Sequence, residues 1–389
     1  MRIKRKYVSS TIIIALGLWL FYSFSFVDVP LLCVTGQNSP WYDLDEQMFD
    51  DIAKGKKTFI VIKSWQRKLK QSGLTAGDQL IADDLIELRT FLRDKPDAIA
   101  CLPWYQVEPE FRTLRYYGVY FWDAEYYPIV RCFSWGWLPK YRRKDIKNIT
   151  FGGTVTLGRD VGNVIERTND VNYPWQKIAK VLRKADLTVV NLESPLVYNY
   201  IRPRTQNLIY GKAAHARGLI SAGVSAVVLT GAHLGDAGLN GLRDTLDVLD
   251  KLNIKHIGIG STAEDVYLPY FFKLENLTIA LFPGVQSKAV YKETDLRGVE
   301  HTYYAAADPA YLLHSAENTT ADAIFVLGKV NSARKNIFSV TDLGGLVFDQ
   351  NSTGRREGRI KRYFFYKKRL VAIDELPVFL GDRWYTELK

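Results

Sequence analysis

Three polar side chains that could do chemistry follow two short apolar runs of the chain. The runs are residues 187–190 and 224–229; Glu193 comes after the first, and His233 and Asp236 come after the second. In a chain that alternates strands with helices, ligands and catalytic groups collect just beyond the carboxyl ends of the strands. We therefore expect Glu193 and His233 to project from neighbouring strand ends into one crevice.

A carboxylate, an imidazole and a second carboxylate could bind a metal ion or only hold one another in place. A two-metal centre needs a bridging carboxylate and further Asp, Asn and His ligands. Glu193, His233 and Asp236 are too few for that, although a single zinc ion can be held by three protein ligands and water. The other interpretation is that His233 hydrogen-bonds Glu193 or Asp236 and orients the loops, since charge pairs are often only structural. We favour this second interpretation and predict no metal, with one divalent ion as the alternative.

Four stretches resemble successive motifs of the CapA family, the poly-gamma-glutamate capsule synthesis proteins. They are residues 151–159 (FGGTVTLGR), 185–195 (ADLTVVNLESP), 230–236 (TGAHLGD) and 342–350 (DLGGLVFDQ). The resemblance extends in order over about residues 148–378. It implies an α/β fold of the metallophosphatase-like kind, a layered sandwich with helices over β-sheets. It also implies a role in capsule or envelope polymer assembly, with polymer ligase and export subunits as partners.

The chain departs from the family pattern where metal ligands belong. The family's first strand ends in Gly-Asp, but Thr154 stands at the Asp position, and the family's Asn-Asn-His reads Gly231-Ala232-His233 here. The histidine-rich motifs of the family have no counterpart between residues 277 and 342. The resemblance therefore implies a degenerate site and a protein that acts by binding. The alternative is a divergent metal-dependent hydrolase or phosphoesterase that still uses Glu193 and His233.

The amino terminus has the pattern of a membrane anchor. Basic residues in positions 2–6 precede an apolar stretch, and residues 7–27 give about the ~20 residues that a bilayer span needs. No small-x-small cleavage site follows. We expect an uncleaved single span in residues 1–30, with the basic end in the cytoplasm and the remainder outside. Residues 31–147 then form a small α/β segment, and residues 148–389 form the CapA-like domain.

The segment before the CapA-like domain has its own pattern of strands and helices. Residues 58–62 and 98–102 read as strands, and residues 78–92 place apolar side chains at helical spacing. Residues 97–115 resemble a fragment similar to periplasmic solute-binding proteins. A third hypothesis is therefore a solute- or polymer-binding module in this segment.

The three cysteines do not have the spacing of a metal-binding cluster. They are Cys33, Cys101 and Cys132. A disulfide between Cys101 and Cys132 is one alternative if the domain is exported, and buried free thiols are the other.

The charge of the chain points to an anionic partner. The formal net charge is +10, which favours a membrane surface or a polyanion, and no recognised motif supports nucleic acid. The densest basic run alternates with aromatic residues and predicts a hairpin with outward basic side chains and a turn near Lys367. An anionic polymer track is one interpretation, and a solvated hairpin face is the other. The basic residues of the run are Arg355, Arg356, Arg359, Lys361, Arg362, Lys367, Lys368 and Arg369.

Overall fold

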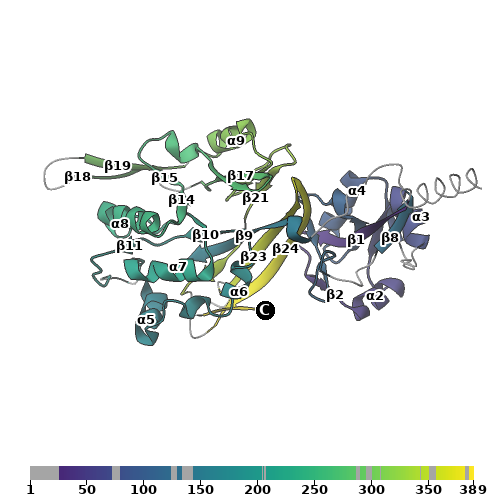
Figure 1. The fold of residues 1–389 in the computed structure, drawn as a ribbon, viewed down its shortest axis with the longest axis horizontal. Coiled ribbons are helices and arrows are strands. Elements are labelled where there is room, and N and C mark those ends of the chain that lie inside the picture. The colour runs from purple at the N-terminus through teal and green to yellow at the C-terminus, as the bar shows by residue number, and fades with distance from the viewer. Residues whose placement is uncertain are drawn as a thin grey trace, which may run out of the picture. The chain divides into compact units, whose positions relative to one another are not determined.

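The chain forms two compact units, Met1–Asp145 (unit 1) and Ile146–Lys389 (unit 2), each described here by itself (Figure 1). The sequence predicted the change of domain between residues 147 and 148. The computed structural model describes residues 26–71, 79–123, 129–133, 143–203, 205, 207–285, 290–294, 300–306, 308–341, 343–349, 356–381 and 385–389.

Unit 1 contains a mixed six-stranded sheet. Its strands are β1 (Phe26–Gly36), β3 (Phe59–Ile62), β4 (Gln79–Ala82), β5 (Ile99–Pro103), β6 (Phe111–Thr113) and β8 (Ile129–Phe133). The order is β4-β3-β5-β1-β6, and β8 also pairs with β1. β3 runs parallel to β4 and β5, and every residue of β3 and β5 is buried. The two continuous apolar runs of the sequence are therefore the central strands of this sheet, as predicted for residues 58–62 and 98–102.

The helices of unit 1 show one error in the sequence prediction. Within the described ranges they are α2 (Glu46–Ala53), α3 (Lys63–Gln71) and α4 (Leu85–Asp94), and a small parallel pair joins β2 (Asp43–Leu44) to β7 (Arg115–Tyr116). The single helix predicted over residues 78–92 is instead the strand β4 followed by α4. Asp84 causes the break, because its carboxylate accepts hydrogen bonds from the main-chain N–H groups of Ile86 and Glu87 and so caps the helix there.

The predicted membrane anchor falls on residues that are largely outside the described ranges. Residues 1–25 are not described, and Phe26 and Val27 already belong to β1, which continues to Gly36. Within the described ranges, no helix has the length and apolar character that crossing a membrane requires.

The strand register of unit 1 rules out the disulfide considered between Cys101 and Cys132. Cys101 lies opposite Cys33 on β1, whereas Cys132 lies opposite Val27, six positions further along the same strand. At about 3.3 Å per residue this is a separation of about 20 Å, far beyond the ~7 Å limit between the Cα atoms of a disulfide. Cys33 and Cys101 are buried free thiols.

Unit 2 is built on an eight-stranded sheet. Its strands are β9 (Ile146–Val155), β10 (Leu187–Leu192), β13 (Ala226–Val228), β14 (Lys255–Ile257), β22 (Gly345–Val347), β23 (Glu357–Tyr366), β24 (Arg369–Leu380) and β25 (Thr386–Leu388). The order is β14-β13-β10-β9-β23-β24-β25, and β22 pairs with the end of β9. The strands β14, β13, β10, β9 and β22 are parallel, whereas β23 is antiparallel to β9.

A second sheet of four strands and two smaller groups complete the strands of unit 2. The second sheet has the order β16 (Tyr270–Leu274), β17 (Leu277–Phe282), β20 (Ala323–Val326) and β21 (Ile337–Ser339). The smaller groups are β11 (Leu196–Val197) with β12 (Gly211–Lys212), and β15 (Ile259–Gly260) with β19 (Glu300–Ala305) and β18 (Val290–Thr294).

The helices of unit 2 cover the two sheets on opposite sides. They are α5 (Arg159–Thr168), α6 (Ala179–Leu182), α7 (Arg217–Ala222), α8 (Gly238–Lys251) and α9 (Pro309–Asn318). The first four share one apolar core with the eight-stranded sheet, and α9 packs on the four-stranded sheet (Figure 1). The aromatic rings of Phe151, Phe325 and Tyr363 fill the space between the sheets, with centroids 4.8 and 4.9 Å apart. Unit 2 is therefore a layered α/β structure.

Candidate functional site

The candidate site lies at the carboxyl end of the parallel part of the large sheet. β10 runs parallel to both β9 and β13, and β22 runs parallel to β9. Residues that follow these strands therefore meet at one edge of the sheet, as the sequence analysis expected for Glu193 and His233. A hydrogen bond of 2.8 Å from Thr230 Oγ1 to Asn191 Oδ1 joins the ends of β10 and β13 directly.

Glu193 lies directly against residue 231. Its main-chain N–H donates to the carbonyl of Val155 at 3.0 Å, which fixes the backbone just after β10. A Cβ atom on Gly231 would lie 2.1 Å from Glu193 Cγ and 2.5 Å from Glu193 Cα. No side chain fits at position 231, where the family pattern has asparagine. Within the described ranges, the half-buried Glu193 carboxylate has no hydrogen-bond partner.

His233 is held by Asp236. The His233 Nδ1 atom lies 2.7 Å from Asp236 Oδ2, and the same oxygen accepts the main-chain N–H of Ile209 at 2.7 Å. The pair is the one that the sequence analysis named as an alternative to a metal site. Because Nδ1 faces the carboxylate, Nε2 is the ring atom left to accept or give a proton, and the imidazole is 30% exposed.

Arg159 and Asp349 form a two-point ion pair at the same edge of the sheet. Arg159 Nε donates to Asp349 Oδ2 at 2.8 Å, Nη2 donates to Oδ1, and the main-chain N–H of Asp160 donates to Oδ2 at 3.1 Å. The Asp349 side chain is 1% exposed. Hydrogen bonding to Asp349 raises the pKa of Arg159, and the carboxylates of Asp160 and Asp236 act in the same direction. The crevice therefore contains an arginine guanidinium, which stays charged, beside the carboxylates of aspartates.

The pairing of Arg159 with Asp349 has no local signal in the sequence. Asp349 lies inside the late motif at residues 342–350, but its partner lies 190 positions earlier, and no local spacing connects the two. The contact depends on β22, which inserts beside β9 so that Thr154 N–H donates to the carbonyl of Gly344 at 2.9 Å. A Cβ atom on Gly153 would lie 1.9 Å from that carbonyl oxygen, which explains why the first motif carries glycine here.

A buried histidine behind the crevice was also missed. His215 is 3% exposed; its Nδ1 lies 2.9 Å from the carbonyl oxygen of Leu157 and its Nε2 lies 2.9 Å from Glu166 Oε1. Lys212 also pairs with Glu166, and its hydrogen bond, followed by that of His215, lowers the pKa of the Glu166 carboxyl. This chain of contacts holds the loop that leads to Arg159.

The side chains at the crevice do not fit a dinuclear metal centre. Across the described ranges, no three His, Cys, Asp or Glu side chains converge in a way that could hold a metal ion. A residue with an oxygen ligand cannot replace Gly231, because its Cβ atom would collide with Glu193. The Asp349 carboxylate is already neutralised by the Arg159 guanidinium. No reaction step through a metal pair is derived from these residues.

The basic run of the sequence has two different parts. Arg355 lies outside the described ranges, and Arg356 is half-buried. Lys361 is only 8% exposed and lies 3.4 Å from Glu375, and Arg362 pairs with the fully buried Asp374. The prediction of outward basic side chains is wrong for these two, because residues on both faces of β23 are buried.

The exposed part of the basic run is the hairpin turn. The turn is near Lys367, as predicted, and Lys367 adopts a left-handed conformation with φ 56°. Lys367, Lys368 and Arg369 are exposed, and Lys368 Nζ lies 3.1 Å from Asp322 Oδ1. Arg359, which is half-buried, lies 3.8 Å from Glu375.

Comparison with solved structures gives only distant likenesses. A hypothetical protein from Thermus thermophilus is 12% identical and matches 59% of this chain and 98% of its own, with a TM-score of 0.33. An ABC-type phosphate transport receptor from Vibrio cholerae is 14% identical and matches 28% of this chain and 56% of its own, with a TM-score of 0.23.

Comparison with protein sequences is more informative. The capsule biosynthesis protein CapA of Bacillus anthracis is 23% identical over 288 residues, which cover 62% of this chain and 70% of that protein. The PGA biosynthesis protein CapA of Bacillus subtilis (strain 168) is 25% identical over 160 residues, 40% of this chain and 42% of that protein. Residues 148–340 match the family described as bacterial capsule synthesis protein PGA_cap. These residues include the crevice from Arg159 to His233, and through them the chain belongs to the CapA family of capsule synthesis proteins.

Proposed function

We propose that this chain serves capsule polymer assembly by binding an anionic polymer of the poly-gamma-glutamate type, without two-metal catalysis. The observation that carries the proposal is the ion pair between Arg159 and Asp349 at the strand ends. In a metallophosphatase-like fold this edge of the sheet would hold the metal ions. Here a guanidinium supplies the positive charge, and Gly231 leaves no oxygen ligand beside Glu193.

Polymer binding is supported by charge. The formal net charge is +10, and Lys367, Lys368 and Arg369 are exposed together at the turn between β23 and β24. Clustered cations bind polyanions with release of counterions, so such binding weakens steeply as salt rises. The relatives in the two Bacillus species are named for capsule and PGA biosynthesis, which makes polyglutamate the first polymer to test.

The test is equilibrium binding of the full chain to poly-gamma-glutamate over a series of salt concentrations. We expect saturable binding at low salt, with an affinity that falls as salt rises. The double variant Lys367→Gln/Lys368→Gln should bind more weakly and with a smaller salt slope. A charge-matched control, Lys180→Gln/Lys184→Gln, changes two exposed lysines of unit 2 that do not belong to the basic run. Absence of binding at low salt would overturn the proposal.

Elemental analysis of the same protein tests the loss of two-metal catalysis. We expect less than one equivalent of divalent metal per chain after purification without chelator. Two equivalents per chain would restore the hydrolase interpretation and contradict the proposal.

A second candidate is a hydrolase that uses the crevice without a metal pair. It is favoured by the 2.7 Å contact between His233 and Asp236, because a carboxylate that orients an imidazole is a common general-base arrangement. Hydrolysis of chromogenic phosphate esters by the full chain, lost in His233→Asn, would support it. His256→Asn is the matched control, since His256 Nε2 lies 3.1 Å from Asp250 and outside the crevice. Equal rates in both variants would reject the hydrolase.

The proposal also includes the location of the protein. We propose that unit 2 lies outside the cytoplasmic membrane, held by one span within residues 7–27, so that it meets the polymer and its ligase and export subunits. A reporter fused after Lys389 should be active only if it is of a kind that works outside the cytoplasm. Activity of a cytoplasmic reporter would contradict this topology.

A further inference from the structure

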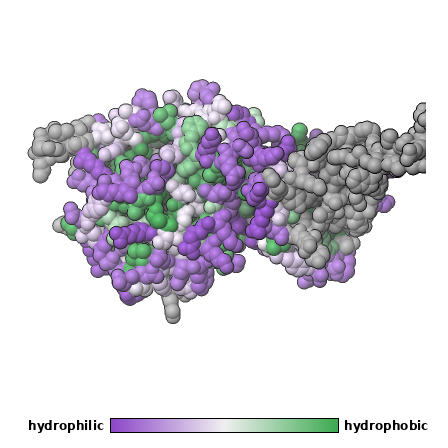
Figure 2. All heavy atoms as spheres, in the orientation of Figure 1, coloured by the Kyte–Doolittle hydropathy of each residue, from purple (hydrophilic) through white to green (hydrophobic). Residues whose placement is uncertain are grey.

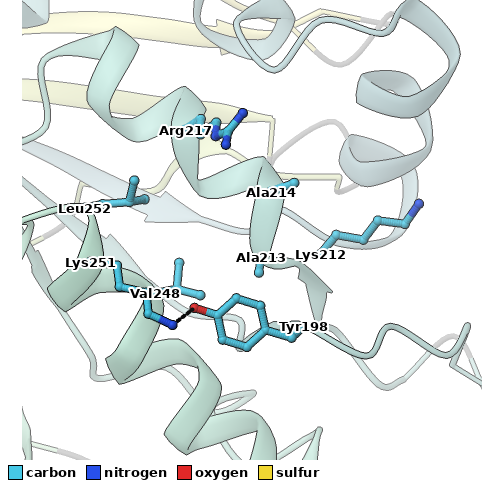
Figure 3. A pocket seen from close by; sticks show the side chains of 8 residues that line it. All are labelled: Tyr198, Lys212, Ala213, Ala214, Arg217, Val248, Lys251 and Leu252. Atoms are coloured by element: carbon cyan, nitrogen blue, oxygen red, sulfur yellow. Dashed lines mark hydrogen bonds between the residues drawn. The ribbon is translucent and has the colours of Figure 1, made fainter.

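A pocket of about 420 Å³ lies in unit 2 between α8, α7 and the short 3₁₀ turn that precedes α7 (Figure 3). Its volume is in the range of small-molecule sites, which is roughly 300–1,000 Å³. Of the residues described above for the crevice and the basic hairpin, only Lys212, which pairs with Glu166 behind the crevice, also lines this pocket. The lining residues are Tyr198, Lys212, Ala213, Ala214, Arg217, Val248, Lys251 and Leu252.

The lining combines positive charge with an apolar floor. Three of the eight residues are cations, none is acidic, and Ala213, Val248 and Leu252 lie among them (Figure 3). With cations and apolar side chains together in its lining, the pocket suits a ligand that carries negative charge on an aliphatic framework. The wider face of unit 2 in Figure 2 also shows hydrophobic residues within a hydrophilic surround.

The cations keep hydrogen-bond donors for a ligand. Lys251 Nζ lies 2.6 Å from Asp247 Oδ2 and 3.2 Å from the Tyr198 hydroxyl, which accounts for two of its three N–H groups. The hydrogen bond to Asp247 raises the pKa of Lys251, so the amine stays charged. Arg217 is exposed, and in the described ranges its guanidinium has no hydrogen bond or ion pair.

We propose that this pocket binds a short segment of a γ-linked glutamyl chain, with carboxylates on Arg217 and Lys251 and methylene groups on the apolar floor. The inference rests on the proposed function and adds a defined site to it. A γ-glutamyl chain separates its carboxylates by apolar methylenes and amides, and the pocket likewise combines apolar side chains with cations from two different helices. A compact inorganic polyanion lacks the apolar part and would leave the floor uncovered.

The experiment measures binding of a short, fluorescently labelled γ-glutamyl oligomer to the full chain. Arg217→Gln should weaken binding about tenfold or more, as expected for the loss of one charge-assisted hydrogen bond. Ala214→Trp should weaken it comparably, because a bulky side chain at this exposed position fills the pocket and leaves every cation in place. The controls are Lys180→Gln for charge and Ala263→Trp for bulk, both at exposed positions outside the pocket. Both controls should bind as the unchanged protein does.

The outcomes separate this inference from the proposed function. If long poly-gamma-glutamate binds but Arg217→Gln and Ala214→Trp take up the oligomer normally, the pocket inference falls and the proposed function stands. If the unchanged protein binds no long polymer at all, the proposed function falls and the pocket inference falls with it. Displacement of the oligomer by polyphosphate or by free glutamate at equal concentration would overturn the choice of ligand.

Discussion

The Arg159 guanidinium and the Asp349 carboxylate join the ends of the parallel strands β9 and β22 across 190 positions of sequence. Three hydrogen bonds reach the carboxylate, two from the Arg159 side chain and one from the main-chain N–H of Asp160. Arg159 itself adopts a left-handed conformation with φ 44°, which is uncommon for a residue with a side chain. The pair therefore holds both the strand β22 and the turn before α5.

Breaking this pair should be costly. Asp349→Asn is expected to lower the free energy of unfolding by about 3–5 kcal/mol, because it removes one charge of a buried pair and keeps the other. Replacing both residues by Leu should cost less than the sum of the single changes. Chemical denaturation measures these differences. Glu357→Gln, which breaks the exposed pair with Lys389, is the control and should cost far less, because water screens an exposed ion pair. Equal losses for Asp349→Asn and the control would contradict the role given to the pair.

The family asparagine cannot be restored at position 231. Gly231→Asn should lower the free energy of unfolding by about 1–3 kcal/mol, since the new Cβ meets Glu193 Cα as well as its side chain. Glu193→Ala should rescue it only partly, because the 2.5 Å approach to Cα remains. Ala232→Asn, at the exposed neighbouring position, should be nearly neutral. Thermal or chemical unfolding of Gly231→Asn, of Gly231→Asn/Glu193→Ala and of Ala232→Asn checks this order, and a neutral Gly231→Asn would show that the crevice can accept the ligand.

The parts of the fold that were predicted correctly have local signals. The two apolar runs predicted as strands, residues 58–62 and 98–102, coincide with β3 and β5 to within one residue. The prediction of one helix over residues 78–92 is wrong because Asp84 caps the helix α4, which therefore begins at Leu85. The apolar residues before Asp84 belong to the strand β4 instead.

The parts of the site that could not be predicted depend on contacts between distant strands. Glu193 and His233 could be placed at one edge of the sheet because each follows an apolar strand. To predict the pairing of Arg159 with Asp349, one would need to know that β22 inserts beside β9. No local sequence pattern indicates this insertion. The burial of Lys361 has the same origin, since it depends on packing against segments distant in sequence, among them Glu375 on the neighbouring strand β24.

The contact between Glu166 and His215 should contribute to stability in a pH-dependent way. Lys212, and then His215, lower the pKa of Glu166 in the folded protein. The contribution is therefore fully present above the ordinary glutamate pKa of about 4.3 and is lost as pH falls through the lower folded value. Glu166→Gln should flatten the acid limb of the unfolding free energy against pH. Glu264→Gln, at an exposed position, should leave the acid limb unchanged, and an unchanged profile in both variants would contradict the assignment.

The two thiols of unit 1 should be unreactive in the folded protein. Cys33 and Cys101 are buried opposite each other, and the hydrogen bond with Cys33, followed by burial, raises the pKa of Cys101. Because the thiolate is the reactive form, labelling by a thiol reagent at neutral pH should wait for unfolding. The measurement uses Cys132→Ser, so that only these two thiols are counted. Rapid labelling under native conditions would show that the β1–β5 contact opens, and a Cys101–Cys132 crosslink in the unchanged protein would contradict the register.

The basic hairpin should separate into structural and accessible cations. Arg362→Gln removes the cation that pairs with Asp374, whose side chain is 0% exposed, and should cost about 3–5 kcal/mol of unfolding free energy. Lys361→Gln should cost less, because Arg359 still lies 3.8 Å from Glu375. Lys367→Gln, at the exposed turn, should change stability by less than about 0.5 kcal/mol. This order matters for polymer binding, since a loss of affinity in Arg362→Gln reports unfolding as well as charge. Chemical denaturation of the three variants checks the order. An Arg362→Gln protein as stable as Lys367→Gln would contradict the structural role of Arg362 and would support the prediction that the whole basic run is exposed.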